Sequence, residues 1–350
     1  MNNPLLRFHM DELPPTTIME VCGTHTQSIA RYGVKQLLPP SVRLVSGPGC
    51  PVCVTDEADL RRALALARMP GVTMLTFGDM LRVPSAQGDS LLHAREQGAD
   101  VRLALSPSDA LALAQALPAR QIVWFAVGFE TTAPLTAVLV KKACALGLRN
   151  LSVLCTHKTM PAALKALLKD DPNVQALLCP GHVAAITGSE AFRFVPRELG
   201  MPAVVSGFSA REVLSALSML LQMRVGGETA LGNAYPAVVT AEGNASALRL
   251  MDEVFVPCDA SWRGLGRIPG SGLALRPEFS RFDASLRFPL PQTEETAAEG
   301  PCRCAAILRG AIRPKECPCF GRACTPQSPM GPCMVSSEGA CSIAFQFGDE

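Results

Sequence analysis

The sequence predicts an α/β fold: two similar α/β domains with parallel sheets, followed by a C-terminal cysteine-rich iron–sulfur domain. Two observations predict the α/β part. Short apolar runs typical of buried strands recur at intervals of roughly 25 to 30 residues, and helical patterns lie between them. This alternation is the signature of parallel sheets with helices on both faces. The third observation is that residues 301–350 contain seven of the fourteen cysteines, a density that an ordinary packed domain does not need.

The expected strands are continuous apolar runs, which fits strands that are covered on both faces. They begin at Val42, Val72, Val101, Ile122, Leu151, Val174 and Ala203. Helical patterns follow at residues 57–68, 131–147 and 161–170. We expect the first α/β domain over residues 1–118, the second over 119–255 and the iron–sulfur domain over 256–350. The strand–helix alternation ends near Val256, and residues 291–301 (PQTEETAAEGP) have the composition of a polar linker.

Charge and composition narrow the class of partners. The chain has 32 basic and 31 acidic residues and only 5% aromatic residues, so no basic surface or stacking platform for nucleic acid is expected. No secretory signal is apparent at the start, and the apolar stretches are interrupted well before the length of a membrane span. We therefore expect a cytoplasmic protein that binds neither nucleic acid nor membrane.

Reactive side chains follow most of the expected strands. Parallel strands place their carboxyl ends at one edge of a sheet, where open α/β proteins bind their ligands. The loops VCGTHT, SGPGCPVC, TFGDM, VGFETT, CTHKTMP and CPGHV are therefore expected to meet at one cleft. They carry Cys22, His25, Cys50, Cys53, Asp79, Glu130, His157, Lys158 and His182.

Two of these loops indicate thiol or metal chemistry. Cys50 and Cys53 have the C-x-x-C spacing of a redox pair, although the same spacing also suits a metal. Cys22 lies three residues before His25, an arrangement that suits a thiolate ligand with a neighbouring acid, base or hydrogen-bond donor.

The C-terminal cysteines predict a cluster. Thiolates select zinc, copper(I) or iron–sulfur clusters, and clusters usually take four of them. The spread of these cysteines among Pro, Gly and Ser lacks the paired knuckles of structural zinc sites, so zinc comes second. A disulfide framework comes third because nothing else in the sequence indicates an oxidising compartment. The cysteines in question are Cys304, Cys317, Cys324, Cys333 and Cys341.

Familiar catalytic motifs are absent from the sequence. It has no P-loop, no G-x-G-x-x-G after the early strands, no GxSxG and no HExxH. Any chemistry is therefore expected to depend on cysteines, metal and the cluster.

Taken in order, several of these motifs resemble the HypD family of [NiFe]-hydrogenase maturation proteins. They are MEVCGTHT, GPGCPVCV, TFGDM, FAVGFETTAP, THKTMPAA, CPGHVAAITG and CTPQSPMGPCMVSSEGAC, over residues 15 to 345. The resemblance implies two α/β domains, a third domain with a [4Fe-4S] cluster and a cleft between them. It also implies a scaffold that works with the chaperone HypC to assemble an Fe(CN)2(CO) unit, with HypE as the source of cyanide.

Carried over by motif, the resemblance implies a role for each matching residue. Cys22 becomes the ligand of the iron that carries CN and CO, with His25 beside it, and Cys50 and Cys53 become a redox pair that can also bind metal. Residues that handle protons or position ligands become Asp79, Glu130, Lys158, His182 and Glu338. The favoured cluster ligands become Cys304, Cys317, Cys324 and Cys341. The chain departs from the family pattern around Cys304, at CRCAAIL, so Cys333 remains an alternative for the fourth place.

Two functions remain open on the sequence. The first is a maturation scaffold and metallochaperone. The second is an iron–sulfur thiol–disulfide reductase that acts on a partner protein. A reductase needs only the C-x-x-C pair and the cluster, whereas a scaffold needs a further soft ligand in the same cleft, a role that Cys22 fits.

Overall fold

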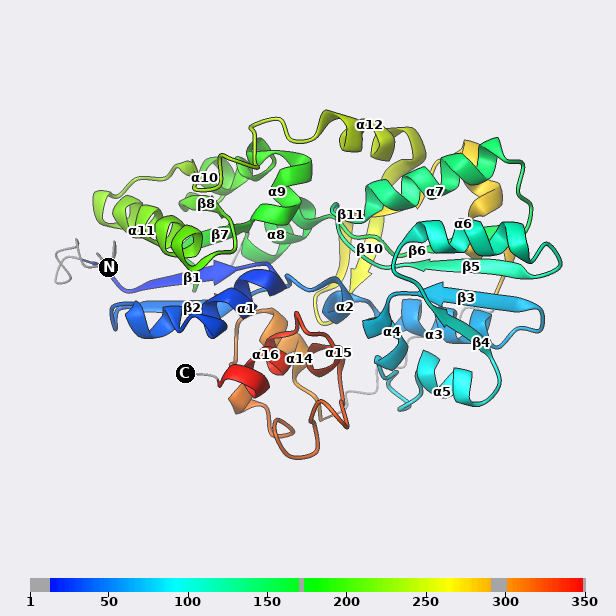
Figure 1. Ribbon diagram of the computed structural model, residues 1–350. Coiled ribbons are helices and arrows are strands. Elements are labelled where there is room, and N and C mark those ends of the chain that lie inside the picture. Colours follow the sequence, from blue (N-terminus) through cyan, green and yellow to red (C-terminus); the bar gives the residue numbers. More distant parts are fainter. Residues whose placement is uncertain (1–12, 170–172, 291–300, 349–350) are drawn as a thin grey trace.

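The computed structural model describes residues 13–169, 173–290 and 301–348. Within them, two parallel-sheet α/β units lie side by side, and the cysteine-rich C-terminal module, drawn in orange and red, packs beneath both (Figure 1). This arrangement confirms the predicted fold class. No helix among the described residues combines the length and the apolar character that a membrane span requires.

The first unit contains a five-stranded sheet with the strand order β2-β1-β7-β8-β9, in which every pair is parallel. Helices α1 (Gly23–Arg31) and α11 (Ala210–Gly226) cover one face of this sheet with apolar side chains. The strands are β1 (Thr16–Glu20), β2 (Val42–Ser46), β7 (Ala176–Pro180), β8 (Ala203–Ser206) and β9 (Leu231–Asn233).

The second unit contains a four-stranded sheet with the order β4-β3-β5-β6, also parallel throughout. Its strands are β3 (Val72–Thr76), β4 (Asp100–Leu103), β5 (Gln121–Ala126) and β6 (Leu151–Cys155). Strands β3, β5 and β6 are buried on both faces, which explains their continuous apolar runs, whereas the edge strand β4 is partly exposed.

The chain visits the two sheets in an order that corrects the expected domain boundary. It leaves the five-stranded sheet after β2, builds the whole four-stranded sheet and returns with β7. The expected boundary at residue 118 therefore falls between β4 and β5, inside one sheet. Long-range strand pairing decides this division, and strand pairing cannot be read from the order of the elements. Residues 291–300 of the expected linker lie outside the described residues.

Helices connect the strands, and local signals fix several of their ends. Capping boxes begin α6 at Ser106 and α11 at Ser209, and α11 ends at Gly227 in the left-handed conformation. The helices are α1 (Gly23–Arg31), α2 (Pro51–Val54), α3 (Glu57–Ala67), α4 (Gly78–Arg82), α5 (Leu91–Glu96), α6 (Pro107–Ala116), α7 (Ala133–Ala145), α8 (Met160–Leu168), α9 (Gly181–Thr187), α10 (Phe194–Glu198), α11 (Ala210–Gly226), α12 (Ala245–Val254), α13 (Ala284–Arg287), α14 (Cys304–Leu308), α15 (Pro332–Val335) and α16 (Ala340–Phe347).

An antiparallel hairpin follows the α/β part, where the alternation was expected to end. Its strands are β10 (Phe255–Trp262) and β11 (Gly266–Leu275). The C-terminal module then packs α16 against α1 and α15 against α2. The fold therefore brings the cysteine-rich module onto the two helices that follow the CGTH and GPGC motifs.

Candidate functional site

Cys22 lies at the amino end of α1, two residues after β1 ends, and is only 8% exposed. Burial, with a smaller contribution from the carboxylate of Glu338, raises the pKa of its thiol to about 12. The backbone N–H groups of His25 and Thr24 oppose this change. The thiol is therefore protonated at neutral pH, and a metal must displace that proton in order to bind.

The GPGC loop packs directly on the backbone of Cys22. The N–H of Gly23 donates to the carbonyl of Gly49 over 3.2 Å. A side chain at position 49 would overlap the backbone nitrogen of Cys22, so only glycine allows this close approach.

Cys50 and Cys53, in the same loop, form a disulfide, with their Cα atoms 5.2 Å apart. Cys50 caps α2, and its Sγ also accepts the N–H of Cys53 over 3.1 Å. Both cysteines are buried. The expected thiol pair is thus in its oxidised form, beside the loop that carries Cys22.

The disulfide borders a small cavity that three parts of the chain enclose. Gly23 and Thr26 of α1 line it, together with Glu338 and with Ile307 of α14. Ile307 also lines the cavity formed by the C-terminal cysteines. The two cavities therefore share the side chain of Ile307 in their walls.

Glu338 links the C-terminal module to α1. The hydroxyl of Thr24 donates to Oε1 of Glu338 over 2.9 Å. Burial raises the pKa of the Glu338 carboxyl, and the nearby Asp79 adds to this rise. The hydroxyl of Ser336 donates to Oδ2 of Asp79, on α4 of the second unit, over 2.8 Å. Asp79 and Glu338, both predicted from their motifs, therefore lie on one polar connection that spans all three parts.

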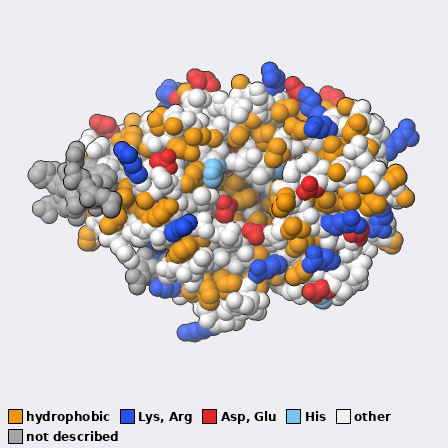
Figure 2. Space-filling model, in the orientation of Figure 1, with side chains coloured by type: hydrophobic (Ala, Val, Ile, Leu, Met, Phe, Trp, Pro, Cys, Tyr) orange, Lys and Arg blue, Asp and Glu red, His pale blue; other side chains and the backbone are white. Residues whose placement is uncertain are grey.

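Two predicted histidines meet at one aromatic ring. Phe208 stacks on His25 at 4.7 Å and on His182 at 3.8 Å between ring centroids. His25 is fully buried, which lowers its pKa to about 4, and its Nε2 lies 3.0 Å from the carbonyl oxygen of Gly207. That contact assigns the proton to Nε2 of a neutral ring. His182 is exposed at the start of α9, and partial burial lowers its pKa. The face shown in Figure 2 is hollowed near its centre, where acidic and histidine side chains are visible.

Sequence reasoning missed Glu20, at the end of β1. Its Oε2 accepts the N–H of Cys22 over 3.1 Å, and its Oε1 accepts the hydroxyl of Thr26. Burial raises the pKa of this carboxyl to about 7. The available signal was an acidic residue at the end of a buried strand, two positions before the cysteine of CGTH.

Glu130 and Lys158 have surroundings different from those of Cys22. Oε1 of Glu130 accepts the N–H of Met160 over 2.9 Å, and burial raises the Glu130 pKa to about 7. The ammonium of Lys158 is buried, donates to the carbonyl of Ser261 over 2.8 Å and lies 3.5 Å from Asp59. Lys158 therefore lines a separate cavity beside the hairpin, together with His157.

Five C-terminal cysteines surround one small cavity below α2. They are Cys302, Cys317, Cys324, Cys333 and Cys341. Cys304 does not line this cavity, but its Sγ lies 2.8 Å from that of Cys333. Burial raises the pKa of Cys302 to about 12 and raises that of Cys341 as well. Cys333, the alternative fourth ligand, thus has a position equivalent to those of Cys317, Cys324 and Cys341.

The donor set of this cavity is compatible with the expected [4Fe-4S] cluster. No three His, Cys, Asp or Glu side chains of the described residues are arranged to hold one metal ion. A four-iron cluster takes one thiolate at each iron, so its ligands surround a cage rather than a point. Thiols around an otherwise apolar cavity, with Ile307, Phe320 and Met334 in its wall, match that requirement.

Comparison with known proteins gives consistent matches. The family model described as "HypD: Hydrogenase formation hypA family" matches residues 6–348. The chain is 46% identical over 339 residues to "Hydrogenase maturation factor HypD" of Azotobacter vinelandii, covering 95% of this chain and 89% of that protein. It is 43% identical over 335 residues to the protein of the same name from Escherichia coli (strain K12), with the same coverage. It is also 46% identical over 341 residues to "Hydrogenase expression/formation protein HupD" of Azotobacter chroococcum, covering 95% of this chain and 89% of that protein.

Proposed function

Because this chain belongs to the HypD family of hydrogenase maturation factors, we propose that it is the scaffold on which an Fe(CN)2(CO) unit is assembled. A HypC-type chaperone and a HypE-type cyanide donor are its partners in this proposal. The observation that carries it is the position of Cys22, a further thiol whose backbone packs on the loop that holds the Cys50–Cys53 disulfide. A thiol–disulfide reductase has no need of that sulfur.

In this proposal the iron unit is cargo, held by the Cys22 thiolate together with a thiolate of the chaperone. Soft thiolates suit iron that carries strong-field carbon ligands better than the nearby carboxylates do. His25 then acts behind Cys22 rather than as a ligand, since its ring is buried and held by the carbonyl of Gly207. Asp79, Glu130, Lys158, His182 and Glu338 are proposed to move protons or to position ligands.

The C-terminal cysteines hold a [4Fe-4S] cluster in this proposal, and the cluster supplies electrons. Reduction of the disulfide breaks its S–S bond, takes two electrons and two protons and leaves two thiols. The cluster passes the electrons one at a time from an external reductant. The support for this route is Ile307, which lines both cavities. The same contact serves a reductase, which remains the second candidate function.

Infrared spectroscopy of the complex, co-expressed and purified with its partners, tests the scaffold. The wild-type complex should show cyanide and carbonyl stretches, and Cys22→Ala should lack them while it keeps its cluster absorption. Cys144→Ala, on α7 outside the site, is the matched control and should keep the stretches. Stretches that persist unchanged in Cys22→Ala would move the iron to Cys50 or Cys53.

A further inference from the structure

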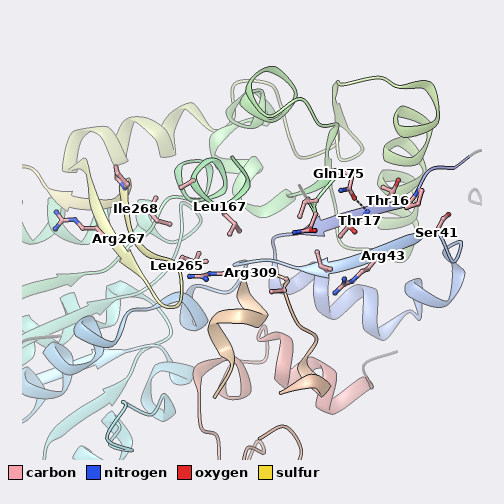
Figure 3. Close-up of a pocket in the computed structure, with 18 residues that line it drawn as sticks. Thr16, Thr17, Ser41, Arg43, Leu167, Gln175, Leu265, Arg267, Ile268 and Arg309 are labelled. Carbon is pink, nitrogen blue, oxygen red and sulfur yellow. Dashed lines mark hydrogen bonds between the residues drawn. The ribbon is translucent and has the colours of Figure 1, made fainter. Parts of the chain in front are cut away.

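A further and larger cavity, of about 1000 Å³, lies at the opposite ends of the strands from Cys22. Its wall includes the start of β1, the first half of β2 and the residues just before β7. The tip of the β10–β11 hairpin and the segment after α14 complete the wall (Figure 3). It shares no lining residue with the cavity beside the disulfide. The proposed assembly site therefore does not account for it.

The charged side chains that are described in the wall of this cavity are all positive. Arg43 of β2, Arg267 of the hairpin and Arg309 after α14 line it, and none of the described lining residues is acidic. Figure 3 shows Arg267 at one side, Arg43 at the other and Arg309 between them. Three cations from distant parts of the chain thus gather around one hollow.

Arg43 and Arg309 lack a hydrogen-bonded or ion-paired partner in the described part of the chain, although the charge of Arg43 contributes to a lowered pKa of the Glu316 carboxyl. The guanidinium groups of Arg43 and Arg309 donate no hydrogen bond and form no ion pair within residues 13–169, 173–290 and 301–348. Arg267 forms an ion pair with Asp259 at 3.4 Å, but both side chains are well exposed, so the pair is weak. All three guanidinium groups are therefore available for a ligand that carries carboxylates or phosphates.

The rest of the wall favours a peptide over a compact phosphate. Phosphate sites commonly use the amino end of a helix, whereas α8 contributes its last turn here and α14 is followed directly by Arg309. Hydroxyl side chains such as those of Thr17 and Ser41 both donate and accept hydrogen bonds, as peptide groups require. Apolar side chains lie between them, including those of Leu167, Leu265 and Ile268.

We propose that this cavity binds an extended acidic segment of a partner protein, whose carboxylates pair with Arg43 and Arg309 while its apolar side chains contact the hairpin tip. Because the lining residues come from the five-stranded sheet, the hairpin and the C-terminal module, the bound segment would hold these three parts together. The inference does not depend on the identity of the cargo at Cys22.

Fluorescence anisotropy tests this docking site on the full chain with its cluster in place. The probe is a short fluorescein-labelled peptide of alternating glutamate and leucine, with glutamine replacing glutamate in the control peptide. The acidic peptide should bind and the glutamine peptide should not. The double variant Arg43→Gln/Arg309→Gln should weaken binding by about tenfold or more, because charge-assisted hydrogen bonds are lost.

The matched control is Arg95→Gln, an exposed arginine on α5 that does not line the cavity, which should change the affinity less than about twofold. Circular dichroism and cluster absorption check that every variant is folded. Equal binding of both peptides, or equal loss in the Arg95 variant, overturns the proposal. Complete displacement of the peptide by inorganic phosphate at a similar concentration also overturns it and assigns the cavity to phosphate.

Discussion

The hydroxyl of Thr24 donates a hydrogen bond to Glu338 although the two residues are 314 positions apart. Gly23, next to Thr24, has no room for a side chain because Glu338 occupies that space. The C-terminal module is therefore seated on the first turn of α1, beside Cys22. Cys22, the Cys50–Cys53 disulfide and the expected cluster site therefore lie close to one interface. Changes in this interface should affect both the stability of the protein and hydrogenase maturation.

Glu338→Gln separates these two effects. Glutamine keeps an oxygen that accepts from Thr24, so the variant should retain its cluster and stability, whereas Glu338→Ala should lose about 1–2 kcal/mol because the hydrogen bond is lost. If the carboxyl handles protons, Glu338→Gln should still fail in a hydrogenase maturation assay. Wild-type maturation by Glu338→Gln would exclude that acid–base role.

The C-terminal cavity should hold about four irons and four sulfides in protein purified anaerobically. Alanine at Cys317, Cys324 or Cys341 should remove the brown cluster absorption, because each of these thiols lines the cavity. Cys144→Ala is the control. Absorption retained in all three single variants would remove the assignment.

The fourth ligand can be identified in the same experiment. Cys304 and Cys333 are in contact with each other, but only Cys333 is in the wall of the cavity. The structure therefore predicts a larger loss of absorption for Cys333→Ala than for Cys304→Ala. A larger loss in Cys304→Ala would restore the ligand set favoured on the sequence.

The sequence predicted most strands because they are short apolar runs, and several of these strands, such as β6 and β8, are buried on both faces. β2, β6 and β8 occupy the expected residues, whereas β10, with Pro257, Cys258 and Asp259 in its course, carries no comparable signal. The rule that strand ends converge placed Cys22 beside Cys50 and Cys53 correctly. It did not reveal that Lys158 lines a separate cavity, since that depends on a hairpin whose packing is long-range.

Cys50 and Cys53 should exchange between disulfide and dithiol. Mass spectrometry after trapping with an alkylating agent should find them linked in oxidised protein and doubly alkylated after reduction. Cys50→Ala should abolish hydrogenase maturation while it leaves the cluster absorption intact. If the two cysteines never pair in solution, the electron relay is wrong, although a metal-ligand role would survive.

Glu130 should make the folded state less stable as the pH rises. Burial raises its pKa from 4.5 to about 7, so between these values the folded state holds a proton that the unfolded state has lost. The free energy of unfolding should therefore decrease as the pH rises across this range. In Glu130→Gln this decrease should be smaller by roughly 1–3 kcal/mol. Urea denaturation at pH 5 and pH 8 measures it, with Glu96→Gln, at an exposed position of α5, as the control. An unchanged pH profile in Glu130→Gln would contradict the prediction.

Gly49→Ala should displace Cys22 without removing any reactive group. The new methyl group would overlap the backbone at Val21 and Cys22, so the GPGC loop and the CGTH helix cannot keep their contact. Overpacking of this kind costs about 1–3 kcal/mol, and the same displacement should reduce cyanide and carbonyl stretches in the co-expressed complex. The matched control is Gly226→Ala, at the last residue of α11. The new methyl group would come no closer than 3.6 Å to a neighbouring atom, in the side chain of Glu228, so this variant should be neutral or slightly stabilising. Cyanide and carbonyl bands of wild-type intensity in Gly49→Ala would mean that binding of the iron unit does not depend on the position of Cys22 against this loop. The assignment of Cys22 as the iron ligand would then fail.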